Sequence, residues 1–236
     1  MATIFYMMKY IHKIKIDVTT YFFLLACYIS GFIKESLVIM FICVWHEVGH
    51  LIIGVMLQKN ISSLKIYPFG GILVINDRIN NSIKKELLLA LGGIMNQLIL
   101  LIIIFYFRQH LDDSLYNMLI RYNLIIIIFN LMPIYPLDGY KIIINVMKLK
   151  ISYYYSLLFS QILSLICLFL FLILLIYFKL YTNLYMVIIL SAFSIKKVLL
   201  FRYEYQRFLV ERLLYNFDYS DIKYSKFNVH LLMQGK

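Results

Sequence analysis

Charged residues are scarce in this 236-residue sequence: they make up 15% of the chain, whereas 63% of the residues are hydrophobic. A composition this poor in charge, with a mean hydropathy of +0.83, does not describe a water-soluble core. Several apolar runs approach the roughly 20 residues that cross a hydrocarbon layer of about 30 Å, and they are too many for a lone signal peptide or anchor. We therefore predict an all-α polytopic membrane protein.

Cysteine is also scarce. The three cysteines, Cys27, Cys43 and Cys167, are odd in number, lie inside apolar runs and form no CxxC pair. This pattern argues against a disulfide framework and against a thiolate metal site. Free cysteine often packs as a small apolar residue, which is the role we expect here. Internal repeats and low-complexity linkers are not evident either.

The apolar runs predict six membrane spans, with bounds uncertain by a few residues. They are about 17–34, 36–57, 86–107, 117–146 with an interruption, 153–178 and 180–200. The more polar residues that follow lead us to divide the chain into a transmembrane domain, 1–200, and a short, partly helical cytosolic tail, 201–236.

Acidic residues are few, with 12 Asp and Glu against 23 Lys and Arg, which gives a formal net charge of +11. The basic residues lie mainly before the first span, in alternate loops and in the tail. The positive-inside rule explains such alternation better than nucleic-acid binding does, so we expect no direct nucleic-acid partner. It also places both termini in the cytosol.

Residues 61–76 interrupt the pattern of plain spans. Hydrophobic and polar residues alternate on both sides of a turn that contains Pro68, Gly70 and Gly71. This pattern predicts a short β-hairpin between the second and third spans. Non-helical backbone is tolerated at membrane depth only where protein covers it or where it lines a wet cavity, so a re-entrant hairpin would mark a cleft. The alternative is an ordinary cytosolic hairpin.

A second interruption, from Asn130 to Gly139, falls inside the fourth apolar segment and reads NLMPIYPLDG. Pro133 and Pro136 remove backbone donors and clash with preceding carbonyls, so the helix must open here. Lipid disfavours exposed broken backbone. The break should therefore face the interior of the helix bundle.

The second span contains the pattern HExxH, formed by His46, Glu47 and His50. On a helix this spacing places two imidazoles one turn apart on one face, where they can bind one zinc ion, with the glutamate beside them. A carboxylate in a span costs about 2.5 to 3.5 kcal/mol and persists mainly where it has a functional partner. The alternative is a structural hydrogen-bonded His/Glu cluster between helices.

A hydrolytic zinc site has three protein ligands and one open position, and Asp138, after the proline break, is the best third ligand. His12, His110 and His230 are expected to be solvated. Zinc in such a site lowers the pKa of water to about 7, and Glu47 would take the proton and pass it to the departing amine. Asn130 could bind substrate backbone or simply end a helix.

In these motifs the chain resembles the site-2 protease family of intramembrane zinc metalloproteases. The family joins HExxH to a later N-x-x-P-x-x-x-L-D-G motif, which this sequence carries from Asn130 to Gly139. The resemblance implies that His46, His50 and Asp138 bind zinc and that Glu47 is the catalytic base. Further family positions are implied as well. Asn130, Pro136, Gly70 and Gly71 would bind or shape the substrate cleft, and residues 92–96 are similar to a Gly-Pro-x-x-Asn element in which Gly93 replaces proline.

Within that family, six short-looped spans with no room for a PDZ domain are most similar to the bacterial stage IV sporulation protease FB group. That resemblance implies removal of a pro-sequence from the membrane-tethered sigma-K precursor, in the mother-cell membrane around the forespore, under small membrane inhibitor proteins. The tail after residue 200 is too short for the group's CBS domain. Anti-sigma factors and signal-peptide remnants are alternative substrates, and a non-proteolytic zinc transporter or scaffold is the alternative of another class.

Overall fold

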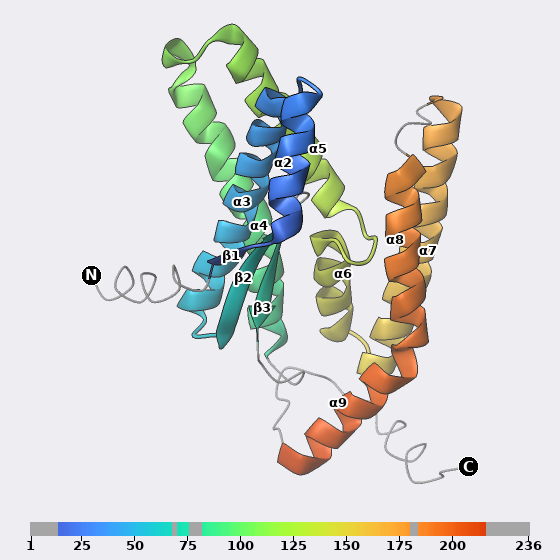
Figure 1. Ribbon diagram of the computed structural model, residues 1–236. Coiled ribbons are helices and arrows are strands. Elements are labelled where there is room, and N and C mark those ends of the chain that lie inside the picture. Colours follow the sequence, from blue (N-terminus) through green and yellow to red (C-terminus); the bar gives the residue numbers. More distant parts are fainter. Residues whose placement is uncertain (1–13, 68–69, 76–81, 180–183, 216–236) are drawn as a thin grey trace. The chain divides into compact units, whose positions relative to one another are not determined.

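The computed structural model describes residues 14–67, 70–75, 82–179 and 184–215 (Figure 1). By their internal contacts the residues divide into two compact units. The first contains residues 1–77 and 88–130, and the second contains residues 78–87 and 131–236.

The first unit combines a small sheet with long helices. Its elements are β1 (Ile14–Ile16), α2 (Val18–Ile29), α3 (Ile33–Met56), β2 (Ile61–Tyr67), β3 (Gly70–Ile75), most of α4 (Ile83–Tyr106), the 3-10 turn η1 (Arg108–His110) and α5 (Asp113–Leu131). The second unit contains the start of α4 and four further helices. These are α6 (Asp138–Lys148), α7 (Tyr153–Tyr177), α8 (Leu184–Leu199) and α9 (Phe201–Tyr215).

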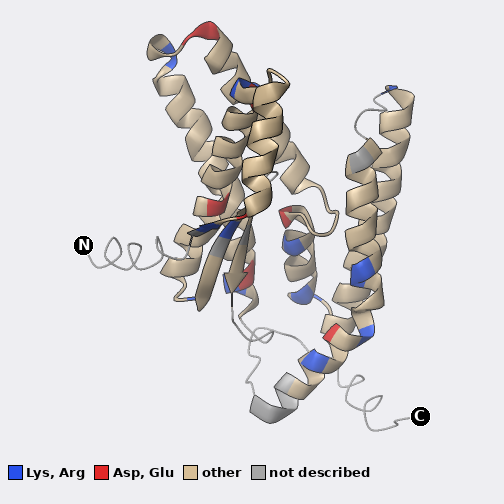
Figure 2. Cartoon of the chain, viewed as in Figure 1, with Lys and Arg blue, Asp and Glu red and all other residues tan. Residues whose placement is uncertain are grey.

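Among the described residues, four helices are long and apolar enough to cross a membrane by length and composition: α3, α4, α5 and α7. Figure 2 shows that charge is sparse along these helices, and α7 carries none. The first and sixth expected spans correspond to α2, with 12 residues, and α8, with 16. Both are shorter than the roughly 20 residues of a full span. Residues 180–183, which begin the sixth expected span, lie outside the described residues.

The predicted hairpin is confirmed, because β2 and β3 pair antiparallel with Lys65 opposite Ile72 and Tyr67 opposite Gly70. Pro68 and Phe69, at the turn itself, lie outside the described residues. The sequence did not reveal β1, which pairs parallel with β2 and completes a three-stranded sheet in the order β1-β2-β3. The sheet packs on α3 through β3.

Helices α3 and α4 approach each other closely where two glycines meet. A Cβ atom added to Gly92 would lie 2.9 Å from the carbonyl oxygen of Gly49. Small residues at a helix crossing allow such contact of the two backbones. The polar residues of α4 are thereby brought within reach of the HExxH turn of α3.

The proline break is also confirmed: α5 ends at Leu131 and α6 begins at Asp138. The connecting residues keep a local backbone bond from the Leu137 N–H to the Ile134 carbonyl at 2.8 Å, and Ile134 is buried. The peptide bond between Tyr135 and Pro136 is cis.

The core of the second unit includes α9, which is the described part of the segment that we predicted as a tail. Buried residues of α6, α7 and α9 pack together, and Phe208 of α9 stacks on Tyr153 with 3.9 Å between ring centroids. The prediction that this segment is partly helical is confirmed by α9. Residues 216–236 lie outside the described residues.

We expect Phe208→Ala to destabilise the second unit, because removing a buried aromatic ring typically costs about 3 to 5 kcal/mol. The apparent melting temperature of the protein in detergent should fall by several degrees. Val210→Ala, two residues along on the exposed side of α9, is the matched control. Equal melting temperatures for the two variants would contradict the packing of α9.

Candidate active site

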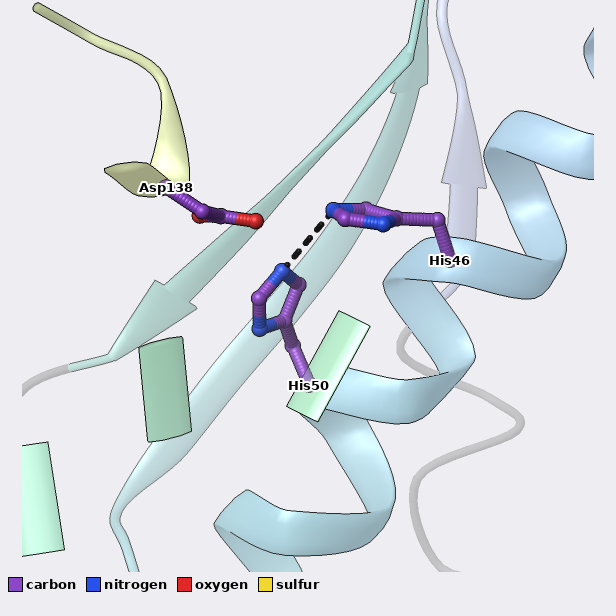
Figure 3. Close-up of side chains that lie close together, drawn as sticks. All are labelled: His46, His50 and Asp138. Carbon is purple, nitrogen blue, oxygen red and sulfur yellow. Dashed lines mark hydrogen bonds between the residues drawn. The ribbon is translucent and has the colours of Figure 1, made fainter. Parts of the chain in front are cut away.

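His46 and His50 lie one turn apart on α3, and both side chains are buried (Figure 3). Their rings meet nearly at right angles, and the two Nε2 atoms are 3.1 Å apart. The helical spacing of HExxH therefore places both imidazoles on one face, as the sequence predicts.

The second ring nitrogen of each histidine is fixed by α4. His50 Nδ1 lies 2.7 Å from the carbonyl oxygen of Leu89, and His46 Nδ1 lies 3.0 Å from the amide oxygen of Gln97. Both oxygens can accept a hydrogen bond from the Nδ1–H group of the ring. With Nδ1 held in this way, Nε2 is the ring atom that each histidine presents to a metal ion.

Two nitrogen ligands bound to a tetrahedral zinc ion at about 2.05 Å are about 3.3 Å apart, close to the separation of the two Nε2 atoms. The pair is therefore already arranged as two ligands of one ion. Histidine ligands of zinc usually donate their other N–H to a fixed acceptor, as both histidines do here.

Gly93 of α4 leaves the space in which the two rings sit. A Cβ atom at this position would lie 2.6 Å from His50 Nε2 and would also clash with the His46 ring. This gives a physical reason for glycine at position 93, where the similar Gly-Pro-x-x-Asn element has proline. Beside it, Asn96 and Trp45 link α4 to α3 by reciprocal bonds: Asn96 Nδ2 donates to the Trp45 carbonyl, and Trp45 Nε1 donates to the Asn96 carbonyl at 2.8 Å.

Glu47 projects from α3 toward the sheet and is partly buried. Its side chain lies directly against the backbone of β3, because a Cβ atom at Gly71 would be 2.5 Å from Glu47 Cγ. Only glycine fits at this contact. Gly70, next to it, has a φ of 146°, a backbone conformation that favours glycine.

Asp138 is the first residue of α6, and its side chain is buried. Its Oδ1 atom accepts a hydrogen bond from Lys141 Nζ, one turn later, at 2.8 Å. The next residue, Gly139, packs so tightly on the carbonyl oxygens of Leu131 and Met132 that no Cβ atom would fit. The break thus holds the start of α6 against the backbone of Leu131 and Met132.

His46, His50 and Asp138 form the one group of three possible metal ligands among the described residues, and one ligand atom of each lies within 4.8 Å of the others (Figure 3). The donor set of two imidazoles and a carboxylate fits zinc. Asn130 lies near the end of α5, partly buried, and Pro136 lies in the connection to α6. His110 is exposed in η1, while His12 and His230 lie outside the described residues.

Sequence reasoning missed Gln97 and Asn123. Both side chains are fully buried, and Asn123 Nδ2 of α5 donates to the Gln97 carbonyl at 3.0 Å. Their amides extend the polar contacts of His46 into α4 and α5. A glutamine directly after the Gly93 to Asn96 element, in an otherwise apolar helix, was the available signal.

The fold is that of a site-2 protease. The solved structure of the site-2 protease from Methanocaldococcus jannaschii matches 78% of this chain and 89% of its own with a TM-score of 0.58, at 22% sequence identity. Among curated proteins, the chain is similar to stage IV sporulation protein FB of Bacillus subtilis (strain 168). These two are 27% identical over 134 residues, 55% of this chain and 46% of that relative.

The chain thus aligns with about half the length of this relative, and no protein-family model matches the chain. The two similarities confirm the resemblance inferred from the motifs. With the four apolar helices, they also support a membrane protein.

We expect Gln97→Leu to weaken zinc binding about 10- to 100-fold, the usual effect of losing a partner that orients a metal-binding histidine. Competition with a chelator on the purified protein would measure the affinity. Gln97→Glu keeps an acceptor oxygen for His46 Nδ1 and should bind zinc far better than Gln97→Leu. Wild-type affinity in the leucine variant would show that Gln97 does not orient His46.

Proposed function

We propose that the chain is an intramembrane zinc metalloendopeptidase that cleaves a membrane-associated protein. The observation that carries the proposal is the convergence of two histidine Nε2 atoms, 3.1 Å apart, beside a buried carboxylate within the fold of a site-2 protease. In this proposal His46, His50 and Asp138 hold one zinc ion. The similarity to stage IV sporulation protein FB supports the same activity.

A zinc ion held by His46, His50 and Asp138 would polarise the carbonyl of the substrate and make water more acidic. His46 and His50 contribute by presenting their Nε2 atoms already oriented, because α4 fixes both Nδ1 atoms. Preorganisation of this kind lowers the cost of reaching the reactive geometry.

Glu47 acts as general base and then as general acid. It follows His46 directly on the same turn of α3, and its side chain is confined by Gly71 of β3. In this position it can accept a proton from the attacking water and deliver it to the departing amine.

The substrate chain is bound beside Glu47 by β3 and by the residues around the proline break. Gly70 and Gly71 give the start of β3 a backbone without side chains, which allows a peptide to come close. Asn130 supplies an amide for substrate backbone, and Pro136 shapes the connection that precedes Asp138.

The substrate that we propose is the membrane-tethered precursor of sigma-K, from which the pro-sequence would be removed. The similarity to stage IV sporulation protein FB supports this choice, as does the alternation of basic loops, which orients both termini toward the cytosol. The protein would then act in the mother-cell membrane around the forespore, restrained by small membrane inhibitor proteins.

Glu47→Gln should abolish cleavage while the protein still binds one zinc ion, because the amide cannot accept the proton but occupies the same space. The measurement is product size after co-expression with the sigma-K precursor, together with zinc content by elemental analysis. The control is Glu35→Gln, at the start of the same helix. Undiminished cleavage by Glu47→Gln would refute the mechanism. If the wild-type protein leaves this precursor intact but cuts an anti-sigma factor or a signal-peptide remnant, the proposed substrate is wrong and the cleaved protein takes its place.

Asp138→Asn should lose most of the zinc, because the neutral amide is a much poorer ligand than a carboxylate. Zinc content of the purified variant tests this, with Asp113→Asn at the exposed start of α5 as control.

Wild-type protein in proteoliposomes should cleave without moving zinc across the bilayer. Zinc flux without cleavage would instead identify a transporter.

A further inference from the structure

Tyr135, three residues before Asp138, is held by helices α7 and α8. Its backbone N–H donates to Ser164 Oγ of α7 at 2.9 Å, and its carbonyl accepts a long bond from Ser194 Oγ of α8 at 3.5 Å. Its ring packs edge-on against Tyr140 of α6, with 5.3 Å between centroids. The connection that leads to Asp138 is therefore fixed through this residue.

Lys197 of α8 lies over the same two rings. Its Nζ atom is 5.1 Å from the centroid of Tyr135 and 6.0 Å from that of Tyr140, the range of cation–π attraction. The backbone of Lys197 is anchored as well, because its carbonyl accepts from Gln161 Nε2 of α7 at 3.1 Å.

The ammonium group of Lys197 is paired with Glu204 of α9. The two carboxylate oxygens lie 2.6 and 2.5 Å from Nζ, and the side chains are only 13% and 24% exposed. A pair this far from water loses hydration, so it is weak evidence for stability. What it does supply is a fixed direction for the ammonium group, toward the rings of Tyr135 and Tyr140.

We propose that the Lys197–Glu204 pair is a positioning device for Asp138: Glu204 holds the Lys197 ammonium over Tyr135, and this contact fixes the connection from which Asp138 enters the metal site. The proposal rests on the proposed function, because it gives Asp138 the role of a zinc ligand. Lys197 and Glu204 act through Tyr135 and touch neither metal nor substrate.

Tyr135 and Asp138 are close in sequence, so the contact between Lys197 and Tyr135 can affect the position of Asp138. The intervening residues are Pro136, whose ring restricts the backbone, and Leu137, whose N–H is bonded back to Ile134 at 2.8 Å. Gly139 is packed without spare space on the carbonyl oxygens of Leu131 and Met132. A displacement of Tyr135 would therefore be passed on to the carboxylate.

The first test is zinc affinity, measured by chelator competition on the purified full chain in detergent. Lys197→Met keeps most of the length of the side chain but removes its charge, and it should weaken binding about tenfold, as for partners that orient metal ligands. The matched control is Lys196→Met, because Lys196 is the exposed neighbour on α8 and should keep wild-type affinity. Should Lys197→Met fail to fold, Glu204→Gln carries the test with the same expected loss.

The second test separates positioning from simple clamping of α8 to α9. The charge-swapped double variant Lys197→Glu, Glu204→Lys restores an ion pair but moves the cation away from the rings. We expect it to recover the melting temperature of the wild type without recovering the zinc affinity. Recovery of both would show a clamp only and would overturn the proposal.

Wild-type zinc affinity in Lys197→Met, or in Glu204→Gln where that variant carries the test, would also overturn it. Failure of the proposed function looks different. In that case the wild-type protein binds no zinc, or Asp138→Asn binds it as tightly as the wild type does, and the positioning proposal falls with it. If instead Asp138→Asn loses zinc while Lys197→Met keeps it, the metal site stands and only the positioning device is refuted.

Discussion

The contact between α3 and α4 holds two buried imidazole rings with their Nε2 atoms 3.1 Å apart, and the candidate metal site depends on it. The rings would turn about their side-chain bonds if their Nδ1 atoms were free. They are not free, because Leu89 and Gln97 hold them from α4. The energy that keeps a metal site ready therefore resides in the contact between α3 and α4, outside the ligands themselves.

That contact explains why α4 combines small and polar residues in an apolar helix. Gly92 lets the backbones of α3 and α4 meet, and Gly93 makes room for the imidazoles. Asn96 crosses back to the carbonyl of Trp45, the residue directly before His46. Each of these three residues contacts α3 within one turn of the HExxH motif. The motif and this part of α4 therefore form one structural element.

The sequence was sufficient where chemistry and spacing act locally. Histidines four residues apart share a helix face, the prolines at 133 and 136 open a helix, and an alternating pattern with a glycine turn gives a hairpin. It was insufficient where a role depends on a distant partner. Gln97 meets His46 across 51 residues of sequence, and β1 has three residues, too few to show a periodicity.

The packing of α9, which follows residue 200, was also not foreseen from the sequence. Its more polar composition led us to predict a cytosolic tail that is partly helical. In the structure Phe208 is buried against Tyr153, other rings of α9 pack beside it, and Glu204 pairs with Lys197. Composition reports the average polarity of a segment, whereas packing depends on individual residues such as Phe208. A polar helix can therefore belong to the unit that carries Asp138 when a few aromatic rings and one ion pair make its contacts.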